Sequence, residues 1–182
     1  MVRLRRIHGE FDQDLEVDWK SFLLRPEPRQ VPLEEFKKYT ESWRRPADME
    51  EEAVFRVWST DEGPPSHSIP PHLAAKAAAR LGPEAFEKVH ERLMRAYFTE
   101  NRNITDTKVL HELWENLGLA REVLEKADNP EMLKEIFAEH NEAINHGVNG
   151  VPAIRMEGVP GVLTGVQDEK VYTRLIRRAL SV

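Results

Sequence analysis

The chain of 182 residues contains no cysteine. This absence excludes disulfide bonds, zinc–thiolate sites and thiolate chemistry within the polypeptide. No apolar run approaches the roughly 18 residues that a membrane-spanning helix needs, and no apolar segment of signal-peptide length follows the first residues. A glycine-rich phosphate-binding loop is also lacking. We therefore expect a cytoplasmic protein with no membrane partner.

The chain also lacks an excess of positive charge. Acidic residues number 32 and Lys plus Arg number 26, which gives a net charge of −6. A protein of this charge has no overall basic field to attract nucleic acid. The small basic cluster of Arg3, Arg5 and Arg6 is typical of a solvated helix face. We therefore expect no nucleic-acid partner.

Three short segments alternate apolar and polar residues, which is the pattern of strands. They lie near residues 15–24, 153–157 and 161–164, and we expect them to share one sheet. Between the first and second, apolar residues recur at helical spacing. Pro83 and Thr105 stand where helices are expected to begin, Thr105 as a cap. This order predicts an α/β domain interrupted by a helical insertion.

Two short motifs stand in the last third of the chain. Gly150-Val151-Pro152 directly precedes the second predicted strand, and Gly165-Val166-Gln167 precedes the last predicted helix. A Ser66-His67-Ser68 loop leads into the helical region. In this order and at these spacings, the motifs resemble the DsbA-like (FrnE-type) thioredoxin-fold dithiol oxidoreductase family. The resemblance covers nearly the whole chain.

The resemblance implies an α/β protein with a thioredoxin-like fold and an all-helical insertion. Residues 1–32 and 129–182 would form a discontinuous thioredoxin-like domain, and residues 33–128 a mainly helical insertion. The implied activity is thiol–disulfide exchange or isomerisation on a thiol or disulfide substrate, either a protein or a small molecule. No cofactor is implied, and glutathione enters only as a candidate substrate.

The chain departs from the resembled family at its start. The family's first strand and the Cys-x-x-Cys pair of its first helix have no counterpart here. The natural chain starts further upstream, or it is a truncation that pairs with another copy, or it is a redox-inactive relative with a rebuilt N-terminus. We expect no catalytic residue and no redox activity, because exchange needs a thiolate. We also expect a homodimer, or a rebuilt N-terminus, because the missing strand would leave backbone groups unpaired.

Four residues are the substrate-binding candidates that the resemblance implies: Val151, Pro152, Gln167 and Asp168. In the family the X–Pro bond is cis, and the backbone before proline pairs with an extended substrate or with glutathione. In the related kappa-class glutathione transferases and hydroxychromene-carboxylate isomerases, residues at the start of the last helix hold the γ-glutamyl end of glutathione. Two structural interpretations stay open: the cis bond only shapes the fold, and Asp168 is simply a helix N-cap.

Two other functions stay open. A glutathione-dependent transferase or isomerase can use a serine in place of the cysteine, and a non-enzymatic binding module would use only the cis-proline edge. Ser66 and His67 combine a nucleophile with a base, but activation needs close geometry and an orienting acid, so we interpret them as a solvated polar loop. His111 is followed four residues later by Glu115, so no zinc motif forms. We expect no metal site.

Overall fold

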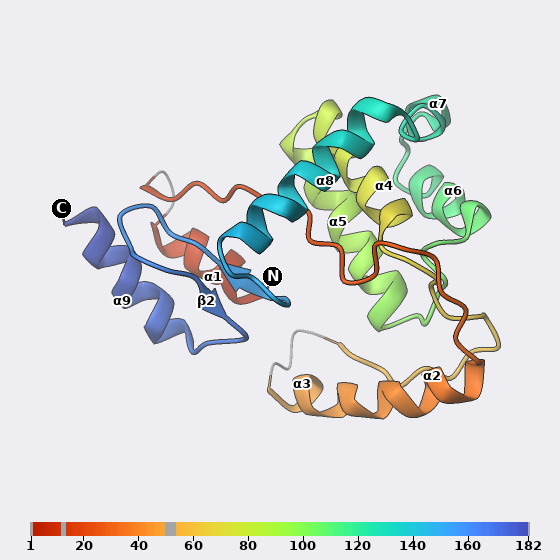
Figure 1. Cartoon of the computed structure of the whole chain (residues 1–182), viewed down its shortest axis with the longest axis horizontal. Coiled ribbons are helices and arrows are strands. Elements are labelled where there is room, and N and C mark those ends of the chain that lie inside the picture. The colour runs from red at the N-terminus through yellow and green to blue at the C-terminus, as the bar shows by residue number, and fades with distance from the viewer. Residues whose placement is uncertain (1, 12–13, 50–53, 182) are drawn as a thin grey trace. The chain divides into compact units, whose positions relative to one another are not determined.

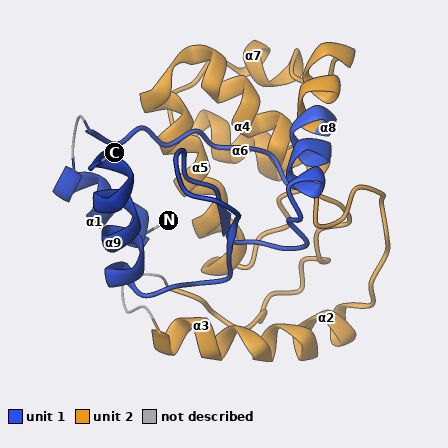
Figure 2. Cartoon of the chain, turned by 60° about the vertical axis from the view of Figure 1, so that its left-hand side comes forward, with its two compact units in different colours: residues 1–22, 137–182 blue, residues 23–136 orange. Residues whose placement is uncertain are grey.

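The structure is a computed structural model, and it describes residues 2–11, 14–49 and 54–181. The chain divides into two compact units (Figures 1 and 2). One unit combines residues 1–22 with 137–182, and the other contains residues 23–136. The long helix α8 begins in the second of these units and ends in the first. The domain limits at residues 32 and 129 stay a prediction.

Two helices and a hairpin form the first unit. They are α1 (Val2–Phe11), β1 (Ala153–Ile154), β2 (Leu163–Thr164) and α9 (Glu169–Leu180). Helix α1 packs against α9, and the core between them buries Ile7, Tyr172 and Ile176. Tyr172 and Ile176 share a core because residues four apart lie on one face of a helix. Apolar residues of the hairpin, including Ile154 and Leu163, pack against this core.

The sheet is smaller than the sequence predicts. Among the described residues it has two antiparallel strands, with Ala153 opposite Thr164 and Ile154 opposite Leu163. The predicted strand at residues 15–24 is wrong, since none of these residues enters a ladder. Side chains from residue 15 to residue 20 still alternate between half-buried and exposed. Alternation therefore reports which side of a segment faces the protein, whereas a strand also needs a neighbouring backbone to pair with.

Helices make up the second unit. They are α2 (Leu33–Thr40), the 3₁₀ turn η2 (Glu41–Trp43), α3 (Arg44–Met49), α4 (Ile69–Leu81), α5 (Pro83–Phe98), α6 (Thr107–Glu115), α7 (Arg121–Glu125) and the start of α8 (Pro130–Asn145). Helix α4 packs against α5, α6 and α7, and its Ala77 and Ala78 are fully buried. In the part of the chain that the structure describes, no helix is long and apolar enough to cross a membrane.

Local chemistry sets the helix starts. Gly82 has φ +119°, and Pro83 follows it at the first position of α5. A positive φ favours glycine, and proline at this position loses no helical hydrogen bond. The predicted cap at Thr105 is wrong, because Asp106 caps α6 by accepting from the N–H groups two and three residues on, at 2.8 and 3.2 Å. The Thr105 hydroxyl instead accepts from the Ser66 N–H at 3.1 Å.

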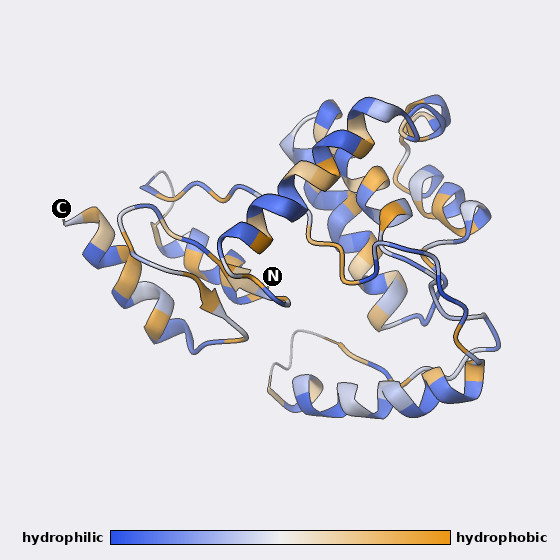
Figure 3. Ribbon diagram, viewed as in Figure 1, coloured by the Kyte–Doolittle hydropathy of each residue, from blue (hydrophilic) through white to orange (hydrophobic). Residues whose placement is uncertain are grey.

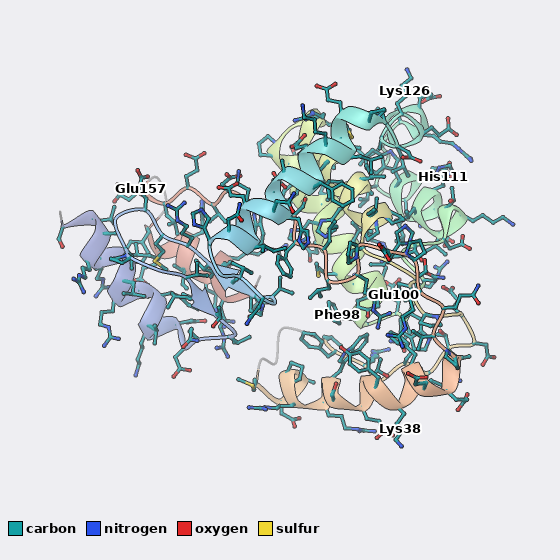
Figure 4. The ribbon with its side chains drawn as sticks, viewed as in Figure 1. Lys38, Phe98, Glu100, His111, Lys126 and Glu157 are labelled. Carbon is teal, nitrogen blue, oxygen red and sulfur yellow. The ribbon has the colours of Figure 1, made fainter. Side chains whose placement is uncertain are left out.

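A cluster of aromatic side chains forms a second core within the helical unit. Phe36, Trp43 and Trp58 are buried there, and Tyr97 and Phe98 pack against them. The rings of Trp43 and Phe98 meet edge to face with their centroids 5.0 Å apart; Phe98 is labelled in Figure 4. This is a preferred geometry for aromatic pairs in protein interiors. The aromatic residues are therefore core, and burial raises the pKa of the Tyr97 phenol.

Candidate functional site

The loop that enters β1 carries the first pair of predicted site residues. The Val151–Pro152 peptide bond is cis, as predicted. Val151 is 52% exposed, and its backbone N–H and C=O have no hydrogen-bond partner within the described part of the chain. Among the described residues, β1 pairs with β2 alone, so no strand covers its other edge. An unpaired edge beside exposed backbone groups can accept an extended chain as an added strand.

Gly165 links the second pair of predicted site residues to the first. Its N–H donates to the Pro152 carbonyl at 2.8 Å, and its φ of +73° favours glycine. Gln167 is two residues further along the chain, so its Cα atom lies within about 7 Å of the Gly165 Cα atom. The Gln167 side chain turns back to the hairpin, where Nε2 donates to the Thr164 carbonyl at 2.9 Å. The structure thus brings Val151, Pro152 and Gln167, with the adjoining Asp168, to one end of the hairpin.

At the start of α9 the backbone N–H groups of Glu169 and Lys170 have no partner among the described residues, whereas that of Val171 donates to the Asp168 carbonyl at 2.9 Å. Asp168 holds the N-cap position of α9 with an extended backbone, as predicted, but its carboxylate makes no capping hydrogen bond. The first N–H groups of a helix lack intrahelical acceptors and carry the positive end of the helix dipole. They can therefore bind a carboxylate, while the exposed Asp168 carboxylate can bind an ammonium group.

Two arginines of α1 reach this helix start. Arg3 Nη1 donates to the Gln167 carbonyl at 2.7 Å, and Arg6 Nε donates to the Glu169 carboxylate at 2.6 Å. Arg3 adds positive charge beside the open N–H groups, and Arg6 offsets a carboxylate that would repel an anionic ligand. From the sequence, both arginines were expected on a solvated helix face. Nothing in their spacing signals a contact more than 160 residues away.

The Ser66–Ser68 loop is a separate polar cluster in the helical unit. Ser66 Oγ lies 2.9 Å from His67 Nδ1, and the Ser68 N–H donates to the Arg25 carbonyl at 2.8 Å. No carboxylate in the described ranges forms a hydrogen bond with His67, so these residues supply no acid to orient a catalytic histidine. The loop is structural, as interpreted from the sequence. It is held by hydrogen bonds and half-buried, however, so the expectation of a solvated loop is wrong.

The sequence model of the DSBA-like thioredoxin domain matches residues 2–177. The chain belongs to this family. The match runs through both compact units, so it includes the helices between the two parts of the first unit. The predicted thioredoxin-like fold with a helical insertion is therefore confirmed.

Solved structures share this DSBA-like fold at low sequence identity. DsbM, a cytosolic disulfide reductase from Pseudomonas aeruginosa, has a TM-score of 0.72 and 21% identity, covering 98% of this chain and 88% of that chain. DsbM with GSH has a TM-score of 0.73 and 21% identity, covering 98% and 89%. A candidate protein disulfide isomerase from Nitrosomonas europaea has a TM-score of 0.76 and 16% identity, covering 99% and 87%. No curated protein matches the chain.

The site of this DSBA-like domain offers binding groups without a sulfur nucleophile, because the chain has no cysteine. Within residues 2–11, 14–49 and 54–181, no group of three or more His, Asp or Glu side chains could hold a metal ion. The groups present are an open strand edge, helix N–H groups, one exposed carboxylate and one guanidinium. Together they suit an extended ligand that carries both a carboxylate and an ammonium group.

Proposed function

We propose that this DSBA-like domain binds an extended thiol or disulfide compound, a peptide or glutathione, along the Val151–Pro152 edge and at the start of α9. The observation that carries the proposal is the hydrogen bond from Gly165 to Pro152, because it sets an open strand edge beside a helix start with unpaired N–H groups. The γ-glutamyl carboxylate would meet those N–H groups, and its ammonium group would meet Asp168. The rest of the ligand would pair with the backbone of Val151.

The family activity, thiol–disulfide exchange or isomerisation, is not carried out by this polypeptide alone. The attacking group in exchange is a thiolate, and the chain has no cysteine to supply one. We therefore infer a redox-inactive protein that holds a thiol or disulfide substrate. A glutathione-dependent transferase or isomerase remains the alternative, since it would use the same binding groups with a serine hydroxyl. A non-enzymatic binding module would need the binding groups alone.

The solved structures support the binding part of the proposal. DsbM shares the fold, and one of its structures contains GSH. DsbM is described as cytosolic, which agrees with the cytoplasmic location that we propose for this protein. We also propose that the protein is a homodimer.

Calorimetric titration with S-methylglutathione tests the binding site, because this ligand cannot be oxidised. We expect the wild-type protein to bind it and Asp168→Asn to bind about tenfold more weakly, since losing a charge-assisted hydrogen bond costs about 1.5 kcal/mol. Glu157→Gln is the matched control, because it removes an exposed carboxylate of the same unit (labelled in Figure 4). A wild-type protein that does not bind, or an equal loss in both variants, would contradict the proposed site.

A further inference from the structure

A row of cations without partners runs along the exposed face of α9. Lys170, Arg174 and Arg178 are spaced four residues apart, all three are exposed, and none of their side chains has an ion-pair or hydrogen-bond partner among the described residues. Four residues advance an α-helix by about 6 Å and slightly more than one turn, so these side chains form one row. Figure 3 shows hydrophilic and hydrophobic residues interleaved along α9, and its apolar side is the buried one.

The carboxylates that helices α1 and α9 themselves carry are already paired with other arginines. Glu169 accepts from Arg6, and Glu10 of α1 accepts from Arg177 at 2.7 Å. Helices α1 and α9 therefore carry no further carboxylate for the row, and the exposed Asp168, one residue before α9, pairs with none of its three cations. Its three positive charges remain available to an external anion.

A row of acids with matching spacing lies in the same unit. Asp14, Glu16 and Asp18 are all exposed, and the apolar residues between them are half-buried. The burial of residues 15–20 alternates as in an extended chain, where alternate residues lie about 6.6–6.8 Å apart, close to the repeat of the cationic row, and Asp14 stands in a 3₁₀ turn just before this segment. Asp14 and Glu16 have no partner, whereas Asp18 lies 3.0 Å from Lys20 Nζ and raises the pKa of that lysine. The acidic row is thus also largely unneutralised.

We propose that two copies of this chain associate through these surfaces, with the acidic row of each copy facing the cationic row of the other. The inference rests on the homodimer proposed above and names its contact surfaces. A two-fold arrangement uses the contact twice and closes the assembly at a dimer. A second copy is favoured over a nucleic acid or an anionic membrane, because it brings acids at the matching spacing for the cationic row and cations for the acidic row, whereas a polyanion offers nothing to the acidic row.

Charge reversal followed by mixing tests this arrangement. The variant D14K/E16K/D18K has two positive rows, and the variant K170E/R174E/R178E has two negative rows, so each should be monomeric in light scattering at low salt. Each dimer dissociation constant should rise by more than about tenfold. An equimolar mixture of the two variants should form a heterodimer, because every row then faces its opposite. Restored association also shows that both variants are folded.

The matched control, K108E/K126E/K134E, reverses three exposed lysines of the helical unit whose side chains have no partner among the described residues, and it should dimerise like the wild type. The wild-type dimer should dissociate at about 1 M salt, where the screening length falls to about 3 Å. A wild-type monomer at low salt, a control that dissociates equally, or a mixture that stays monomeric would overturn the arrangement. Light scattering without ligand measures association alone, so this outcome is independent of glutathione binding.

Discussion

Replacing Tyr172 by phenylalanine should loosen the start of α9 without disturbing the core beneath it. The Tyr172 ring is 4% exposed and packs beside Ile7 and Ile176, and phenylalanine keeps that ring. The hydroxyl accepts a hydrogen bond from the Gln167 N–H at 3.2 Å. The substitution therefore removes one defined contact between the core and the proposed binding loop.

The size of this effect follows from the geometry of the hydrogen bond. A hydrogen bond contributes about 0.5–1.5 kcal/mol to stability, and a separation of 3.2 Å is at the long end of the range for N–H donors. Gln167 is half-buried, so water can partly replace the lost acceptor. We therefore expect a cost of about 0.5–1 kcal/mol, which corresponds to a factor of about two to five in an equilibrium constant.

Amide hydrogen exchange at Gln167, followed by NMR, measures this loss at the site itself. Protection of the Gln167 N–H should fall by about two- to fivefold, since exchange reports local opening. The affinity for S-methylglutathione should fall by a similar factor, because the loop that holds Gln167 and Asp168 is less well ordered. Exchange at residues of α5 should be unchanged.

Tyr39→Phe is the control, because Tyr39 is 58% exposed and its hydroxyl has no partner. It should change neither exchange nor affinity. Unchanged protection of Gln167 in Tyr172→Phe would refute the role of the hydroxyl. A loss of global stability above about 2 kcal/mol would show instead that the ring has moved, because removal of one hydroxyl cannot account for a loss of that size.

Two further predictions address the chemistry and the fold. Purified protein should reduce insulin disulfides no faster than dithiothreitol alone, because the chain has no cysteine, and clear turnover would refute the redox-inactive assignment. Asn101 has φ +55°, is 2% exposed, and accepts from the Ser59 N–H at 3.0 Å while donating to the Arg56 carbonyl at 3.2 Å. Asn101→Gly should cost about 1–3 kcal/mol in urea unfolding through lost hydrogen bonds, and Asn101→Ala about 1 kcal/mol more through its backbone conformation. Equal costs would show that the positive φ carries no penalty.

The sequence by itself was enough to determine the family, the helices and the cis-proline loop. Helices form hydrogen bonds between residues four apart, so their apolar spacing and end signals such as Pro83 are written locally in the chain. The order of short motifs, from the Ser66 loop to Gly150-Val151-Pro152, was sufficient to assign the thioredoxin-like fold with its helical insertion. The absence of cysteine by itself excludes thiolate chemistry within the chain.

Only the tertiary structure decided which backbone and charged groups find partners. The pattern at residues 15–20 indicated the buried side of the segment correctly, but a strand also needs a neighbour that lies far away in the sequence. Asp168 stands where a cap is expected and makes no capping bond, while Arg3 contacts Gln167 from the other end of the chain. Hydrogen bonds and ion pairs between distant segments depend on how the chain returns to itself, and short-range patterns do not encode that return.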